Sequence, residues 1–156
     1  MAPHYGAAST PEDTGTAELV VVGAGPAGAA AAAWAARGGR SVILVDAARF
    51  PRDKTCGDGL TPRAVAELRL LGLGPWLDEH IRHGGLRMTG FGSTLDVDWP
   101  GPSFPAAGSA VPRTELDDRI RQVAEDAGAV MRLGVKAVDV ERGSSGRVVA
   151  VVLADG

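Results

Sequence analysis

Three glycines, Gly23, Gly25 and Gly28, have the spacing G-x-G-x-x-G within the stretch VVVGAGPAGAAAA. In this spacing the first glycine permits a tight turn, the second lets the backbone approach a pyrophosphate, and the third brings a helix close to a strand. The N–H groups at the start of that helix, and its positive dipole end, attract phosphate. An acidic residue, Asp46, follows about 20 residues later, where a carboxylate can accept hydrogen bonds from ribose hydroxyls. Together these residues predict a dinucleotide-binding site.

The surrounding pattern places the glycines in a βαβ unit. Residues 19–22 form a short apolar run typical of a buried strand, and residues 41–46 form a second one. Between them, the alanine-rich residues 27–37 predict a helix, with a proline in its first turn and a Gly-Gly pair after its end. The glycines therefore lie at a strand-to-helix turn, as a phosphate site requires. A glycine-rich turn in an ordinary βαβ unit without a ligand is the alternative.

A second candidate for chemistry is Cys56, the one cysteine of the chain. It lies in the loop AARFPRDKTCGDGL, which is basic, contains glycine and is suited to run along an extended cofactor. A thiol is mostly protonated at neutral pH and can donate that proton, whereas nearby cations such as Arg52 and Lys54 favour the thiolate. A lone cysteine is more commonly a small buried hydrophobe, and that interpretation stays open.

The rest of the chain predicts further short elements. Residues 62–71 predict a helix that Thr61 caps, and residues 75–83 predict another short helix. The pattern also predicts two strands on either side of the Gly92-Ser93 pair. The second of these strands has one apolar face and one solvent-exposed polar face. The helix that ends at Gly128 has a charge-rich face, which we expect to be solvated: Glu115, Asp117, Asp118, Arg119 and Arg121. Strands follow at residues 129–133, 135–141 and 147–154.

Composition excludes several classes of protein. The 156 residues are 45% hydrophobic and 22% charged, with a net charge of -3, so nothing indicates a nucleic-acid partner. A single cysteine cannot form an internal disulfide and suits a cytoplasmic protein, and His80 and His83 lack a third metal ligand.

Residues 1–17 have no signal-peptide pattern and predict a disordered leader. Because the chain ends on the turn pair Asp155-Gly156, we expect it to be the N-terminal part of a longer protein.

The stretches VVVGAGPAGAAAA, FPRDKTCGDGLTPRAV and VPRTELDDRI resemble the FAD-dependent geranylgeranyl reductase family, within the larger para-hydroxybenzoate hydroxylase-type flavoprotein fold. The stretches KTCGDGLTPRAVAEL, HGGLRMTGFG and VDWPGPSFP are most similar to the menaquinone-reducing branch of that family. The resemblance covers essentially everything after Glu18. It implies an α/β fold with a Rossmann-like FAD-binding βαβ domain, a β-hairpin within residues 84–105 that contributes to the substrate-domain sheet, and a β-meander that begins at Val135. Because the family's later Gly-Asp motif is absent, residues 18–156 form an incomplete FAD-binding domain.

The resemblance also assigns roles to individual residues. FAD is the implied cofactor, and Cys56 is the one candidate for supplying or tuning a proton in catalysis. As an alternative, Arg113 only starts its helix and pairs with Glu115. The implied FAD-binding residues are Gly23, Ala24, Gly25, Pro26, Ala27 and Gly28 in the first loop, Asp46 at the ribose, Cys56, Gly57, Asp58 and Gly59 beside the isoalloxazine, Arg113, and Ala137 near the adenine edge.

The activity implied by the resemblance is reduction of an isolated C=C bond in a polyprenyl chain. The partner is then a hydrophobic, menaquinone-like or geranylgeranyl substrate, with an electron donor that the sequence does not identify. Peripheral membrane contact would come from the C-terminal part that is missing here. Two alternatives stay open: an FAD-dependent monooxygenase or halogenase of the same fold, and an inactive truncated fragment.

Overall fold

The computed structural model describes residues 15–155, so residues 1–14 of the predicted leader lie outside the described part. The chain divides into two compact units. Unit 1 consists of residues 15–53 and 114–155, and unit 2 consists of residues 54–113. The dinucleotide-binding pattern therefore lies in unit 1, and the boundary between the units falls within the cysteine loop, with Arg52 in unit 1 and Cys56 in unit 2.

Unit 1 is built on a parallel sheet with the strand order β1-β2-β8. Its elements are β1 (Leu19–Val22), α1 (Pro26–Arg37), β2 (Val42–Asp46) and β8 (Val130–Leu133). The first three confirm the predicted βαβ unit, and β2 is central, with its first four residues buried. Helix α1 buries four alanines, whose small side chains let the helix pack closely on β1 and β2.

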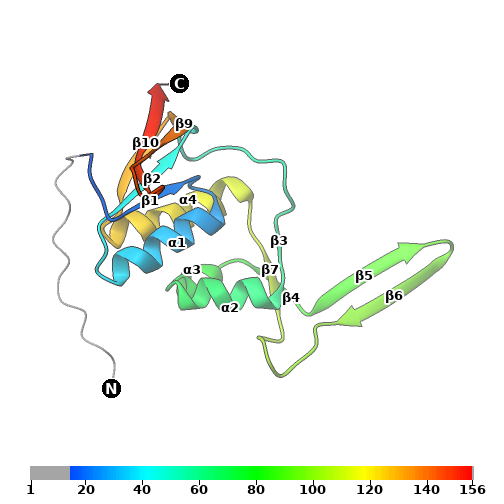
Figure 1. Ribbon diagram of the computed structural model, residues 1–156. Coiled ribbons are helices and arrows are strands. Elements are labelled where there is room, and N and C mark those ends of the chain that lie inside the picture. The colour runs from blue at the N-terminus through cyan, green and yellow to red at the C-terminus, as the bar shows by residue number, and fades with distance from the viewer. Residues whose placement is uncertain (1–14, 156) are drawn as a thin grey trace, which may run out of the picture. The chain divides into compact units, whose positions relative to one another are not determined.

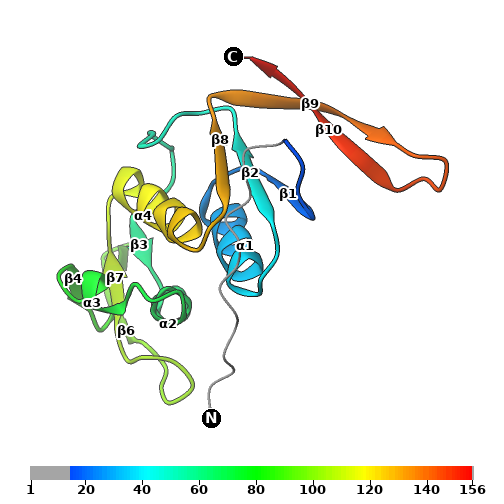
Figure 2. The ribbon, with the colours of Figure 1, turned by 90° about the vertical axis from the view of Figure 1, so that its left-hand side faces the viewer.

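Helix α4 (Arg113–Asp126) runs beside α1 in both views of the molecule (Figures 1 and 2). Its apolar positions, Leu116, Ile120, Val123 and Ala124, are buried, as their helical spacing predicts. The chain leaves the helix through Gly128, whose φ of 99° favours glycine. It then enters β8, which pairs in parallel with β2 from Val130 to Leu133.

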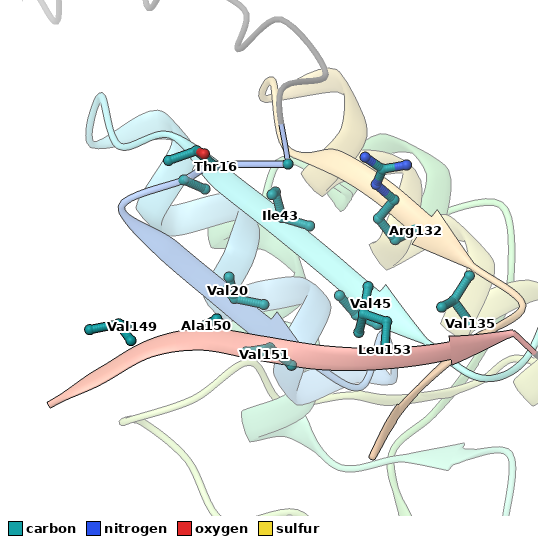
Figure 3. Close-up of a pocket in the computed structure, with 12 residues that line it drawn as sticks. Thr16, Val20, Ile43, Val45, Arg132, Val135, Val149, Ala150, Val151 and Leu153 are labelled. Carbon is teal, nitrogen blue, oxygen red and sulfur yellow. The ribbon is translucent and has the colours of Figure 1, made fainter. Parts of the chain in front are cut away.

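A β-hairpin completes unit 1 and confirms the expected start of a meander. It consists of β9 (Val135–Arg142) and β10 (Val148–Asp155), which pair antiparallel. Strand β10 passes over the sheet face opposite α1 (Figure 3).

At the start of β1, Glu18 accepts hydrogen bonds from the backbone N–H of Ser41 and from Arg40, and both interactions lower the pKa of Glu18.

Unit 2 has helices α2 (Pro62–Leu70) and α3 (Gly74–Leu77) beside a small antiparallel sheet. The sheet has the strand order β3-β7-β4, with β3 (Gly59–Leu60), β7 (Gly108–Ala110) and β4 (Ile81–His83). The side chain of Thr61 accepts a hydrogen bond from the N–H of Ala64, which confirms the predicted cap. The helix expected over residues 75–83 is wrong beyond Leu77, because residues 81–83 pair with β7 instead. Such pairing between distant segments leaves no local sequence signal.

The last element of unit 2 is the hairpin of β5 (Gly85–Gly90) and β6 (Ser93–Asp98), which confirms the two predicted strands. Four apolar side chains share one face and are 40–60% exposed within the described residues: Leu86, Met88, Leu95 and Val97. On the other face, hydrogen bonds from Arg87 lower the pKa of Asp96. The expected apolar face exists, but nothing in the described residues buries it.

Among the helices of residues 15–155, none has the length and hydropathy of a membrane-spanning segment.

Candidate functional site

The glycine-rich loop leaves β1 at Gly23, whose backbone takes a φ of 100°. Residues with a side chain rarely adopt this conformation, so the first glycine of the motif provides the turn as predicted. The Gly23 N–H donates to the carbonyl of Val45 at 2.7 Å, which ties the loop to the end of β2. The loop is thereby held at the carboxyl edge of the sheet, where open α/β sheets bind their ligands.

Gly28 brings α1 close to β1. A Cβ placed on Gly28 would lie 1.8 Å from the carbonyl oxygen of Gly23 and 3.3 Å from a methyl group of Val21. Any side chain at this position would therefore push the start of the helix away from the strand. The third glycine of the motif thus has the packing role that the sequence predicts.

Helix α1 begins at an N-cap residue that has no side chain to cap the first backbone donors. Its N-cap is Gly25, which makes no side-chain cap, and Pro26 occupies the first turn. The first N–H groups of a helix have no partner within it, and together with the helix dipole they attract an anion. At Gly25 the nearest atom that an added Cβ would meet is Nη2 of Arg52, at 3.4 Å. The backbone is therefore open where a phosphate would approach, and the loop fits the pyrophosphate of a dinucleotide.

Asp46 ends β2 and points its carboxylate at the loop. Oδ2 accepts a hydrogen bond from the N–H of Ala24 at 2.7 Å, and Oδ1 accepts one from the N–H of Ala48 at 2.8 Å. Each carboxylate oxygen can accept about two hydrogen bonds, so acceptor capacity remains for the hydroxyls of a ribose. The two backbone bonds fix the side chain in place before any ligand arrives.

The cysteine loop is organised around Asp58. Its side chain accepts a hydrogen bond from the N–H of Arg113 at 3.1 Å, and its carbonyl accepts one from Val111 at 3.0 Å. The loop is thereby joined to the first residue of α4, which brings two predicted cofactor residues together. Cys56 is exposed, so its interpretation as a buried core side chain is wrong.

The structure groups the predicted FAD residues into two sets. Unit 1 holds residues 23–28, Asp46 and Ala137, which lies in β9 opposite Leu153. Unit 2 holds residues 56–59 and Arg113. Hydrogen bonds join the glycine-rich loop to Asp46 in the first set and Asp58 to Arg113 in the second. Contact of the second set with a flavin stays a prediction.

Part of the charged face of α4 is buried. The charged face of α4 is not solvated throughout, because Asp117 is fully buried and lies with its Oδ2 3.5 Å from Nη2 of Arg52. The expectation for Asp117 was therefore wrong. Its position one residue after the buried Leu116 gave a weak signal, but its partner in a distant loop gave none.

A pocket of about 370 Å³ lies between the sheet and β10, on the face away from α1 (Figure 3). Its lining is mainly aliphatic, with Val20, Ile43 and Val45 from the sheet and Val151 and Leu153 from β10. Neither the glycine-rich loop nor Asp46 contributes to it. Thr16 and Arg132 also line the pocket, so it is not purely aliphatic. Because the pocket is separate from the glycine-rich loop and Asp46, the candidate cofactor site is the loop at the carboxyl edge of the sheet.

Sequence comparison supports this assignment. Residues 16–155 match the family described as FAD binding domain. The menaquinone reductase of Mycolicibacterium smegmatis is 73% identical over 140 residues, which are 90% of this chain and 34% of that protein. Digeranylgeranylglycerophospholipid reductase 1 of Methanosphaera stadtmanae is 28% identical over 130 residues, 83% of this chain and 32% of that protein. The chain thus spans about a third of the length of these curated relatives.

Comparison with solved structures gives the same fold. The flavin-dependent brominase Bmp2 superimposes with a TM-score of 0.77 at 26% identity, over 90% of this chain and 34% of that one. The myxobacterial chondrochloren halogenase CndH, an FAD-dependent halogenase, gives a TM-score of 0.79 at 25% identity, over 89% and 33%. These matches confirm the predicted flavoprotein fold of the para-hydroxybenzoate hydroxylase type and its partial extent.

Proposed function

Because the chain belongs to the FAD binding domain family and its cofactor is FAD, we propose that it is the cofactor-binding part of a reductase acting on an isolated C=C bond of a polyprenyl chain. The observation that carries this proposal is the 73% identity to a menaquinone reductase over 90% of the chain. The similarity to digeranylgeranylglycerophospholipid reductases supports the same substrate class, since both relatives' names denote prenylated molecules. The substrate we favour is therefore a menaquinone-like quinone with an unsaturated prenyl tail.

When bound and reduced, FAD supplies a hydride to one alkene carbon. The chain's own residues then have three tasks. The N–H groups at the start of α1 bind the pyrophosphate, Asp46 holds the ribose, and the Cys56 thiol gives a proton to the other carbon. Water returns the proton to Cys56 after each turnover. An exposed thiol is suited to this exchange because solvent reaches it.

The β5–β6 hairpin supplies a surface for the substrate domain in this proposal. A two-stranded hairpin is at best marginally stable alone in water, and its apolar face of Leu86, Met88, Leu95 and Val97 is exposed in the described residues. We infer that this face packs into the substrate-domain sheet.

The proposed reductase is a cytoplasmic protein that meets its lipid-like substrate at a membrane surface.

The proposal is tested with the complete polypeptide that carries these 156 residues, loaded with FAD and reduced with dithionite under nitrogen. Menaquinone with an unsaturated tail is the substrate, and mass spectrometry detects the product. After the quinone ring is reoxidised in air, we expect a quinone that retains two additional hydrogen atoms in its tail, and no such product when FAD is omitted. A quinone that stays unchanged here would overturn the proposal.

A second candidate function is oxidation or halogenation, because the brominase and halogenase structures match the chain at 25–26% identity. It is separated from the first by repeating the assay in air, with a nicotinamide reductant and with or without bromide. Incorporation of oxygen or bromine into a product would favour this candidate. Tail reduction alone, unaffected by bromide, would favour the reductase.

Replacement of Cys56 tests the proton transfer. We expect Cys56→Ala to lower kcat for tail reduction about 100-fold, a typical loss for removal of a general acid, while the Kd for FAD changes by less than about 2-fold. Cys56→Ser retains a hydroxyl and should recover part of the rate. Steady-state formation of the tail-reduced quinone, followed by mass spectrometry, gives kcat, and flavin fluorescence gives Kd. An unchanged kcat in Cys56→Ala would remove Cys56 from the mechanism.

A further inference from the structure

Arg52 lies between the glycine-rich loop and helix α4, entirely within unit 1. Its Nη2 is 3.5 Å from Oδ2 of Asp117, and the side chain of Asp117 is 0% exposed while that of Arg52 is 19% exposed. The same Nη2 lies 3.4 Å from the point where a Cβ on Gly25 would be. The guanidinium therefore lies directly over the N-cap residue of α1.

Two neighbours restrict the orientation of this guanidinium. The carboxylate of Asp117 attracts it from α4, and it is stacked over the ring of Phe50, with Cζ 4.9 Å from the ring centroid. An arginine stacked on an aromatic ring and paired with a carboxylate has lost much of its conformational freedom. A guanidinium has five N–H donors, so one contact with Asp117 leaves others for a ligand.

A buried carboxylate is costly unless a cation accompanies it. Here the cation is Arg52. Its guanidinium also lies beside the N-terminus of α1, where Gly25 provides no side-chain cap. The charge of Asp117 is thus balanced by a guanidinium that also lies beside Gly25. An ion pair with a purely structural role does not need its cation to lie beside a backbone segment that binds a ligand.

We propose that Arg52 is a phosphate-binding residue of the FAD site, with Asp117 and Phe50 as the residues that position it. The planar guanidinium donates hydrogen bonds to the pyrophosphate from the side opposite the N–H groups of α1. Gly25 has no side chain, so phosphate and guanidinium can approach the same backbone position. This inference rests on the FAD assignment and adds a cationic ligand that the glycine motif does not contain.

The test compares binding of FAD, ADP and adenosine by calorimetry, in the complete polypeptide and its Arg52→Ala variant. Hydrogen bonds to a charged group typically stabilise enough to change a dissociation constant about 10- to 100-fold. We expect Arg52→Ala to weaken FAD and ADP by this factor and to leave adenosine, which has no phosphate, unchanged. The affinity for ADP should also depend less on salt in the variant. Arg52→Lys should recover part of the loss.

Arg40→Ala is the matched control, because it removes the same charge from the same unit. Arg40 precedes β2 and pairs with Glu18 at 2.8 Å, whereas the glycine loop and Asp46 follow the ends of their strands. Since β1 and β2 are parallel, the two sites lie at opposite edges of the sheet. We expect the control to bind FAD and ADP within about 2-fold of the unmodified protein.

Removal of Arg52 leaves Asp117 buried without this cation, so Arg52→Ala can lose its fold. Thermal unfolding reports this, and the double variant Arg52→Met/Asp117→Leu then replaces the pair by apolar side chains, an exchange that is often neutral for stability. FAD and ADP affinities within about 2-fold of the unmodified protein, in a folded variant, would overturn the proposal while leaving the FAD assignment intact. Failure of the unmodified protein to bind FAD would overturn both.

Discussion

Substitution of Gly28 by alanine is expected to abolish FAD binding and to destabilise unit 1. The added Cβ would lie 1.8 Å from the carbonyl oxygen of Gly23, and that oxygen belongs to backbone, which cannot turn aside as a side chain can. The start of α1 would have to move away from β1, carrying its N–H donors out of register with the loop. Overpacking of this kind typically costs about 1–3 kcal/mol and occasionally more, and we expect about 3 kcal/mol here.

Urea denaturation measures the loss of stability, and flavin fluorescence measures the loss of binding. Gly25→Ala provides the contrast. Its Cβ would meet only the far end of Arg52 at 3.4 Å, an ordinary contact, and its φ of -66° suits any residue. The fold should therefore survive in Gly25→Ala, while the new methyl group hinders approach of the pyrophosphate and lowers FAD affinity. A stable Gly28→Ala protein that binds FAD normally would contradict the close approach of α1 and β1.

Replacement of Asp46 is expected to have the second largest effect. In Asp46→Ala the N–H groups of Ala24 and Ala48 lose their acceptor, and a bound ribose loses its own. Loss of an acceptor from a charged group costs about 1.5–3 kcal/mol, so the combined loss should raise the Kd for FAD about 100-fold or more. Asp46→Asn should lose nearly as much, because its amide nitrogen must face one of the two N–H donors.

The control for this experiment is Asp139→Ala. Asp139 lies in β9 of the same unit, is exposed, and accepts a hydrogen bond from the backbone N–H of its neighbour Val140. Its removal changes the net charge by the same amount and should leave FAD affinity within about 2-fold. If Asp46→Ala binds FAD as tightly as Asp139→Ala does, the ribose contact and the tethering of the loop are both refuted.

The two sets of predicted cofactor residues differ in the unit that holds them and in the hydrogen bonds that connect their residues. The first set lies in one unit, where hydrogen bonds join the glycine-rich loop to Asp46 and to the end of β2. The second set is joined around Asp58 in the other unit. The large effects above are expected at Gly28 and Asp46 because the structure gives their contacts within unit 1, whereas the effect of Cys56→Ala depends on the reductase proposal.

The local sequence alone determined the βαβ unit and its site. Gly23, Gly28 and Asp46 act through backbone conformation, close approach and position at a strand end, and all three depend on residue type and short spacing. The helix at residue 62 was equally predictable, since Thr61 and Pro62 form a local start signal. Such features need no knowledge of distant segments, so a pattern of a few residues was sufficient.

Only the tertiary structure decided the remainder. Residues 81–83 form a strand because β7 pairs with them, and Asp117 is buried because Arg52 reaches it from a loop more than sixty positions earlier. The same pairing brings Arg52 over Gly25, which no spacing in the sequence indicates. The physical reason is that burial of a charge, or addition of a strand, depends on a partner brought near by folding, and local patterns contain no information about that partner.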